Sequence, residues 1–345
     1  MAVFFDKISA FISQKTSQEN TDVSLAATQE SKFHQAVQKG NFNQIHSEVS
    51  RGYDVNARNM YGKTGLELAA ETGNISMVEY LVSLGADVNM QSTSGDGPLL
   101  IATKANNVDM LYALVNLGAD INKPDSYGET ILHKFSIQDE NDAYTHQELL
   151  NLGANIEARD IYGKTPLHHQ VGANSTKTVS QLLSFGANIN ARDKEGRTPL
   201  YDSISYGHNE IFETLLSFNP NVNIPDKNGL TPLHIAIQSK NPYFATRLID
   251  IGTNINAQDT YGQTPLHHAI ATGNVEMATL LIKRGANPFI RDKSGQTPLN
   301  KAPNHQIFTE MKLLVQEHQT PNASSTLSRH EIRHPNSFSP PSRSM

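Results

Sequence analysis

A short box of residues, Thr-Pro-Leu-His in its fullest form, returns along this chain every 33 residues, and no other property of the sequence limits the fold so severely. The box position falls at Thr64, Gly97, Thr130, Thr165, Thr198, Thr231, Thr264 and Thr297. The spacing departs from 33 once, with 35 residues between Thr130 and Thr165, and a further copy begins at Ser31. A period of this length indicates a repeat architecture, in which each repeat packs only on its neighbours.

Each part of the repeat favours a pair of helices. Thr is a preferred helix N-cap, and Pro suits the first helical position because its missing N–H would be unpaired there anyway. A second helix after a Gly-Asn pair carries apolar residues on one face, as at Ile75, Val78, Leu81 and Val82. A Gly that follows the box by 21 residues is expected to end this helix in the left-handed conformation, with Asn219 in its place once.

These repeats resemble ankyrin repeats, whose signature is a 33-residue turn-helix-helix with a Thr-Pro-Leu-His box. The full Thr-Pro-Leu occurs at five positions, and three of them continue with His168, His234 and His267. The resemblance covers residues 31–319 and implies an all-α repeat solenoid of about nine stacked helix-turn-helix repeats with β-hairpin fingers. We place the repeats near residues 31–59, 60–92, 93–125, 126–160, 161–193, 194–226, 227–259, 260–292 and 293–319.

Two added residues interrupt the period in the fourth repeat. We place them within residues 137–146 and interpret them as a longer turn between the two helices. A partner-facing irregularity is the alternative. Added loop length costs little free energy, which favours a tolerated insertion.

Composition argues against several kinds of site. The chain has no cysteine, which removes disulfides, thiolate nucleophiles and cysteine zinc sites. Its net charge is −6, whereas nucleic-acid binders are usually basic, so we expect no nucleic-acid partner. No catalytic motif stands in a suitable context, and we predict no catalytic residue, metal or cofactor. The resemblance implies a structural hydrogen bond for the histidines that share the box position, which are His34, His133, His168, His234 and His267.

The two ends of the chain lie outside the repeats. Residues 1–12 carry Phe4, Ile8, Phe11 and Ile12 at helical spacing, which predicts a short amphipathic helix before a polar linker that ends near residue 30. Such a helix could contact a membrane surface or a partner, but the single Lys within it favours a helix that folds back or frays. Residues 320–345 are rich in Ser, Pro, Arg and His, and we predict a disordered tail.

The fold leaves the residues beside each fingertip Gly unconstrained. In the ankyrin family partners often contact the fingertips and the concave helix face, and tyrosine is enriched in binding hot spots. We therefore predict a non-enzymatic scaffold or adaptor, monomeric and cytoplasmic, that binds a protein partner. The residues predicted to bind it are Tyr61, Lys63, Tyr127, Glu129, Tyr162, Lys164, Arg197, Tyr206, Leu230, Tyr261 and Gln263.

Three further hypotheses stay open. Similar arrays with unrelated tails occur among effectors that intracellular bacteria secrete into host cells, so secretion into a host cell is one alternative setting. A peripheral membrane adaptor anchored by residues 1–12 is another. The resemblance also implies that a finger-base Asn can be hydroxylated when Leu precedes it by eight residues and Asp by two, and Asn89 and Asn122 match this pattern.

Overall fold

The computed structural model describes residues 31–92, 95–137, 140–239 and 241–319. The chain divides into two compact units, Met1–Ile235 and Ala236–Met345, called here the N-terminal and C-terminal units. The described residues form helices and loops with no β-strand, apart from an isolated bridge between Arg58 and Thr64. The all-α repeat solenoid is therefore confirmed. The predicted N-terminal helix and C-terminal tail fall on residues 1–30 and 320–345, outside the described residues.

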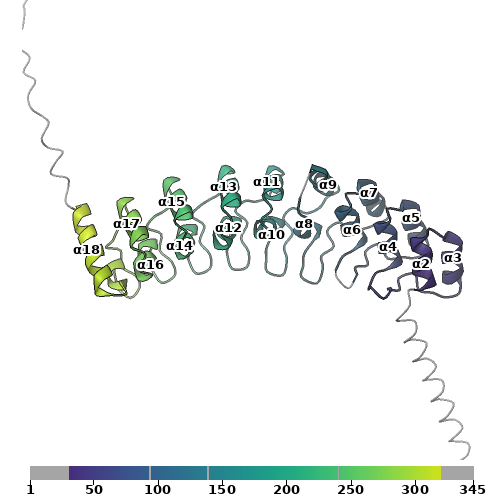
Figure 1. Cartoon of the computed structure of the whole chain (residues 1–345), viewed down its shortest axis with the longest axis horizontal. Coiled ribbons are helices and arrows are strands. Elements are labelled where there is room, and N and C mark those ends of the chain that lie inside the picture. The colour runs from purple at the N-terminus through teal and green to yellow at the C-terminus, as the bar shows by residue number, and fades with distance from the viewer. Residues whose placement is uncertain (1–30, 93–94, 138–139, 240, 320–345) are drawn as a thin grey trace, which may run out of the picture. The chain divides into compact units, whose positions relative to one another are not determined.

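Helices of the N-terminal unit lie in two layers, with the finger loops beside the first layer (Figure 1). The first helix of each repeat is called the inner helix and the second the outer helix. The inner helices are α2 (Lys32–Gln38), α4 (Gly65–Glu71), α6 (Pro98–Lys104), α8 (Ile131–Lys134), α10 (Pro166–Gly172) and α12 (Pro199–Tyr206). The outer helices are α3 (Phe42–Ser50), α5 (Ile75–Ser83), α7 (Val108–Asn116), α9 (Glu140–Asn151), α11 (Thr176–Ser184) and α13 (Asn209–Ser217).

The C-terminal unit repeats the same arrangement over fewer helices. The boundary between the units falls within the inner helix α14 (Pro232–Gln238). The helices that follow are α15 (Pro242–Asp250), α16 (Pro265–Ala271), α17 (Val275–Lys283), the 3-10 helix η1 (Pro298–Lys301) and α18 (His305–Gln319). The last inner helix is thus a single 3-10 turn, and α18 packs against both α17 and η1.

Caps at both ends of the helices follow the sequence prediction. The Thr64 hydroxyl accepts a hydrogen bond from the Glu67 N–H at 3.2 Å, and the Asn74 side chain accepts one from the Met77 N–H at 3.0 Å. Gly85 ends α5 with φ of +96°, and Asn219 takes the same left-handed role after α13 with φ of +54°. Each contact satisfies a backbone group that a helix end would otherwise leave unpaired.

The core of each repeat lies between its helix pair and the next. Met77, Val78 and Leu81 of α5 are fully buried, and each such side chain contributes about 1.5–3 kcal/mol to folding. Packing also explains one departure from the box. A Cβ atom at Gly65 would lie 2.7 Å from the ring of Phe33 in the preceding repeat, so the proline found elsewhere in the box does not fit there.

The fourth repeat differs from the prediction in its helices. The connection between α8, which ends at Lys134, and α9, which begins at Glu140, is longer than that between α10, which ends at Gly172, and α11, which begins at Thr176, as the sequence predicted. In addition, α8 ends after a single turn at Lys134 and α9 begins early, at Glu140. Phe135 has φ of −90° and ψ of 118°, which is an extended backbone and ends the inner helix. This shortening could not be predicted, because the period locates added residues but does not assign them to a helix or a turn.

Polar side chains replace apolar ones in the core beside this insertion. Gln170 of α10 is buried and donates through Nε2 to the backbone carbonyls of His133 at 3.0 Å and Phe135 at 3.2 Å. It thereby satisfies carbonyls that the shortened α8 leaves unpaired. His146 of α9 is fully buried, stacks on Phe135, and has no hydrogen-bond partner on either ring nitrogen. Burial lowers its pKa to about 4, so this imidazole is neutral at pH 7.

Candidate functional site

The finger loops are held by an aspartate rather than by a β-ladder. In the N-terminal unit, Asp160 Oδ1 accepts the N–H groups of Tyr162 and Lys164, both at 2.8 Å. The Asp160 carbonyl also accepts the Gly163 N–H at 2.9 Å, which closes the turn. Gly163 has φ of +75°, a conformation that other residues rarely adopt. None of these contacts uses the side chains of Tyr162 or Lys164, so the turn leaves both positions free to vary.

Three pairs of neighbouring fingers in the N-terminal unit, from the fourth repeat to the seventh, are joined by one backbone hydrogen bond each. The Ile161 N–H donates to the Tyr127 carbonyl and the Lys194 N–H to the Tyr162 carbonyl, both at 2.9 Å. The Lys227 N–H donates to the Glu195 carbonyl at the same distance. The fingertips therefore form a row with fixed spacing.

Where the box contains a histidine, that histidine ties its inner helix to the next finger, as the resemblance implied. His168 Nδ1 accepts the Thr165 N–H at 3.2 Å, which leaves the proton on Nε2, and Nε2 donates to the Arg197 carbonyl at 3.1 Å. His133 makes the same contacts with Thr130 and the Lys164 carbonyl. Burial lowers the pKa of both imidazoles, to about 4 for His133. Both imidazoles are neutral, and both nitrogens of each ring are used in hydrogen bonds within the repeat array. We therefore assign His133 and His168 a structural role.

A second histidine, which the sequence analysis did not assign, binds the finger aspartate. His169 Nε2 lies 2.9 Å from Asp160 Oδ2, and its Nδ1 lies 3.8 Å from Glu129 Oε1. Burial would raise the pKa of Asp160, but the hydrogen bonds from His169 and from the Lys164 and Tyr162 N–H groups outweigh it and lower the pKa. The signal that could have identified this contact is the basic residue, Lys134 or His169, that follows the box histidine in the fourth and fifth repeats.

Glu129, Asp160 and His169 also form the cluster of described residues whose geometry could hold a metal ion, with ligand atoms within 4.8 Å of one another. The existing hydrogen bonds already use this set. Asp160 accepts two N–H groups through Oδ1 and the His169 N–H through Oδ2. The arrangement fits a hydrogen bond between His169 and Asp160 that holds the finger on the inner helix.

The predicted partner-binding tyrosines stand at the fingertips and are exposed. The exposed fractions are 68% for Tyr61, 58% for Tyr127 and 60% for Tyr162 in the N-terminal unit, and 70% for Tyr261 in the C-terminal unit. None of the four hydroxyl groups forms a hydrogen bond within the described residues. Exposed Met60 and Ile161 lie next to Tyr61 and Tyr162, and the sequence analysis had not singled them out.

Residues predicted just after the fingertip Gly are more constrained than the tyrosines. Lys63 pairs with Glu71, and the Arg197 Nε lies 3.2 Å from Asp193 Oδ2. Lys164 Nζ lies 2.9 Å from Asp202 Oδ2 and over the ring of Tyr206, which is itself exposed at the end of α12. Leu230 and Gln263 are half-buried. Several positions just after the fingertip Gly therefore carry charged side chains that are held in ion pairs, whereas the fingertip tyrosines beside them are exposed and unpaired within the described residues.

The two asparagines predicted as hydroxylation sites lie in a ladder between repeats. Asn89 Oδ1 accepts the Asp120 N–H at 2.7 Å, and its Nδ2 donates to the Gly118 carbonyl at 3.1 Å. Asn122 makes the same pair of contacts with the Asn155 N–H and the Gly153 carbonyl. Both side chains hold neighbouring repeats together, so an enzyme would have to detach them to reach them.

Comparison with known proteins agrees with this geometry. The family model for ankyrin repeats in three copies matches residues 33–125, 117–193, 135–226 and 169–259, and the model for many copies matches residues 248–302. Among solved structures, the chain is similar to the ankyrin repeat domain of Bcl-3, described as a unique member of the IkappaB protein family, with 26% identity and a TM-score of 0.55. That match covers 63% of this chain and 99% of the Bcl-3 chain. No curated protein matches the sequence.

Proposed function

Because this chain belongs to the ankyrin repeat family, we propose that it is a non-enzymatic scaffold that binds a protein partner through its fingertips and the exposed side of its inner helices. The fingertip tyrosines carry the proposal. They are exposed aromatic rings on a backbone that is fixed without them, and a rigid aromatic side chain gives a large contact area at a small cost in entropy. The fixed ion pairs beside them, such as Lys164 with Asp202, would set the register of the partner.

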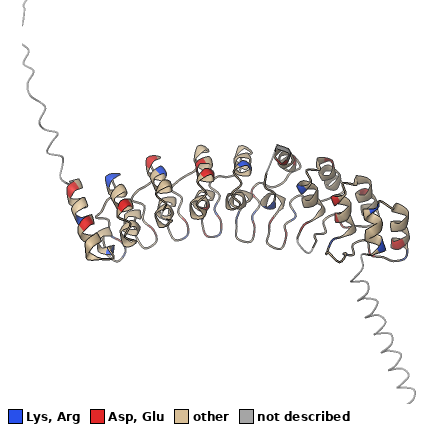
Figure 2. Ribbon diagram, in the orientation of Figure 1, with Lys and Arg blue, Asp and Glu red and all other residues tan. Residues whose placement is uncertain are grey.

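Distribution of charge favours a protein over a nucleic acid. Figure 2 shows acidic and basic residues interspersed on the helices of the N-terminal unit rather than gathered in one basic region. A nucleic-acid surface needs a cluster of Lys and Arg to neutralise phosphates.

Site-specific crosslinking tests the proposal. A photoreactive phenylalanine analogue at Tyr127 or Tyr162 should capture the partner, and the same group at Tyr144 on the outer helix α9 should not. A binding test then compares two alanine variants. The first replaces the four fingertip tyrosines, Tyr61, Tyr127, Tyr162 and Tyr261, and the second, a control, replaces Tyr144 and Phe289. Tyr144 and Phe289 are as exposed, at 59% and 56%, but lie off the fingertips. Equal capture by both variants, with the helical signal unchanged, contradicts the fingertip assignment.

The remaining hypotheses have direct tests of their own. The described helices include none that is long and apolar enough to cross a membrane. Liposome flotation of the chain with and without residues 1–12 tests the membrane adaptor, and equal flotation ends that idea. A reporter fusion secreted into infected host cells tests the effector setting. Mass spectrometry of peptides containing Asn89 and Asn122 tests hydroxylation through the mass of one added oxygen.

A further inference from the structure

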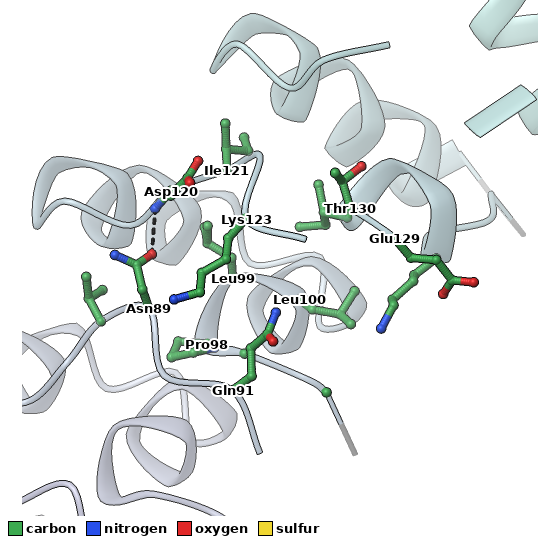
Figure 3. A pocket seen from close by; sticks show the side chains of 15 residues that line it. Asn89, Gln91, Pro98, Leu99, Leu100, Asp120, Ile121, Lys123, Glu129 and Thr130 are labelled. Atoms are coloured by element: carbon green, nitrogen blue, oxygen red, sulfur yellow. Dashed lines mark hydrogen bonds between the residues drawn. The ribbon is translucent and has the colours of Figure 1, made fainter. Parts of the chain in front are cut away.

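A small pocket in the N-terminal unit opens between the third and fourth repeats. Its volume is about 50 Å³. Its walls come from the loops after α5 and α7, from the start of α6 and from the base of the fourth finger (Figure 3). Val88, Pro98, Leu100 and Ile121 make the lining largely apolar.

Two substitutions in the box explain the pocket. The third repeat has Gly97 where other repeats have Thr, and Leu100 where the fourth has His133. In repeats that carry the histidine, such as the fourth, its Nε2 donates to the carbonyl of the next finger, as from His133 to Lys164. The corresponding carbonyl here, that of Glu129, accepts the Asp125 N–H at 3.0 Å and no other donor among the described residues. The third repeat therefore leaves both an empty space and an unused acceptor.

Of the charged side chains that line the pocket, Lys134, Glu129 and Asp120 have contacts of their own, although Asp120 meets only a neutral backbone N–H. Lys134 Nζ lies 2.6 Å from Asp125 Oδ2, Glu129 faces His169, and Asp120 Oδ1 accepts the Asn122 N–H at 2.9 Å. Lys123 is exposed, and within the described residues its ammonium group has no hydrogen bond or ion pair. Figure 3 shows its side chain running across the pocket toward Asn89.

We propose that this pocket receives a leucine-sized side chain of the protein partner, and that an acidic residue directly after it pairs with Lys123. The inference rests on the proposed function and names the chemistry of one anchor in the partner. A water-sized group needs about 10–15 Å³, so the pocket takes about four such groups, which is the size of an isobutyl side chain. A backbone N–H of the partner would donate to the free lone pair of the Glu129 carbonyl.

Three capped dipeptides test the anchor on the full chain by NMR titration. Acetyl-Leu-Asp-amide is expected to bind in the millimolar range and to shift the amide signals of Gly95, Gly97 and Glu129. Acetyl-Ala-Asp-amide should bind at least about 10-fold more weakly because it lacks the methyl groups that fill the pocket. Acetyl-Leu-Asn-amide should bind about 3-fold more weakly because it cannot form the ion pair. Equal binding of the Leu and Ala peptides, or no binding of the first peptide at its solubility limit, overturns the proposal.

A variant that restores the box provides the matched control. Gly97 has φ of −114° and ψ of 172°, which Thr adopts readily, and an added Cβ would meet Gln91 Cγ at 3.5 Å, an ordinary contact. The variant Gly97→Thr, Leu100→His should have an unchanged or higher melting temperature, but it should no longer bind acetyl-Leu-Asp-amide. Unchanged peptide binding by this variant contradicts the pocket. If this variant does not fold, Lys123→Glu replaces it as the test. Lys123→Glu should bind acetyl-Leu-Lys-amide more tightly than acetyl-Leu-Asp-amide, because the charge at the rim is reversed. If it still binds acetyl-Leu-Asp-amide more tightly, both the ion pair and the proposal are wrong.

Failure here is distinguishable from failure of the proposed function. If the peptide binds but the fingertip crosslinks capture no protein, the pocket proposal is supported and the fingertip assignment is wrong. Fingertip crosslinks without peptide binding give the opposite result.

Discussion

In the C-terminal unit, Nε2 of His268 lies 2.9 Å from Oδ2 of Asp259, directly below the finger that Asp259 holds. The same position in three other repeats carries a basic side chain toward the same oxygen, with Lys134 on Asp125, His169 on Asp160 and Lys301 on Asp292. Where this position is apolar in the second and third repeats, at Leu68 and Ile101, the aspartate is replaced by Asn59 and Ser92. The sixth and seventh repeats keep Asp193 and Asp226 although the paired position holds Asp202 and Ile235. The pairing is therefore a property of the repeats that carry a basic residue there, where the partner offsets the cost of burying the carboxylate.

Exchanging one kind of pair for the other tests this relationship. His169→Leu and Asp160→Asn should each destabilise the chain by about 1 kcal/mol, since each leaves a buried polar group unpaired. The double variant reproduces the Leu68 and Asn59 pair and should recover about half of the summed loss. Chemical denaturation of the four proteins measures the coupling. Strict additivity would show that the two positions are independent.

Acid should weaken the fourth repeat through His146. Its pKa is about 4 when folded and about 6.5 when unfolded, so the unfolded chain binds the proton more readily. The stability that the neutral ring provides is complete above pH 6.5 and falls as the pH drops toward 4, by about 2–3 kcal/mol at most.

His146→Leu restores the residue type found at Leu111 in the preceding repeat. It should flatten the stability profile between pH 6.5 and 4 and leave the chain more stable at pH 5. Thermal unfolding at several pH values measures both effects. His318→Leu on the exposed end of α18 is the control, and an equal flattening there would contradict the assignment to His146.

Gln170→Ala should destabilise the chain even though alanine stands at this position in six other repeats, at Ala36, Ala69, Ala102, Ala236, Ala269 and Ala302. The amide satisfies carbonyls that the shortened α8 exposes, so its removal leaves buried acceptors unpaired at a cost of about 2 kcal/mol. Ser203→Ala, at the same position of the sixth repeat, should cost less than half as much, because the hydroxyl bonds only within its own helix to the Leu200 carbonyl. Urea denaturation compares the two variants, and equal losses would remove the special role of Gln170.

Gly65→Pro completes the Thr-Pro-Leu box of the second repeat but should destabilise it. The new ring would overlap Phe33, which is fully buried and stacked on Tyr53, and such overpacking costs about 1–3 kcal/mol. The double variant Gly65→Pro, Phe33→Leu makes room for the proline and should recover part of the loss relative to Phe33→Leu alone. A higher melting temperature for the single variant would contradict the steric explanation.

Local rules in the sequence were sufficient to predict most of the fold. Thr64 and Asn74 cap helices because their side chains accept nearby N–H groups, and Gly85 ends one because it tolerates positive φ, so a single sequence reveals all three. The shortened α8 and the role of Gln170 were not predicted, because they depend on contacts between residues 35 or more positions apart. The pocket was missed for a related reason. In the sequence, Gly97 and Leu100 indicate only a degenerate copy of the box. The space that they leave depends on how the fourth finger packs over them, which the sequence does not show.

The single hydrogen bond between neighbouring fingers, such as that from Ile161 to the Tyr127 carbonyl, has a consequence for how such a chain can change over generations. Because backbone atoms and the aspartate keep the loops in register, the amino acid displayed at each tip can be exchanged at almost no penalty to folding. Affinity for a new target is thus accessible by point substitution, one tip at a time, while the helices beneath stay constant.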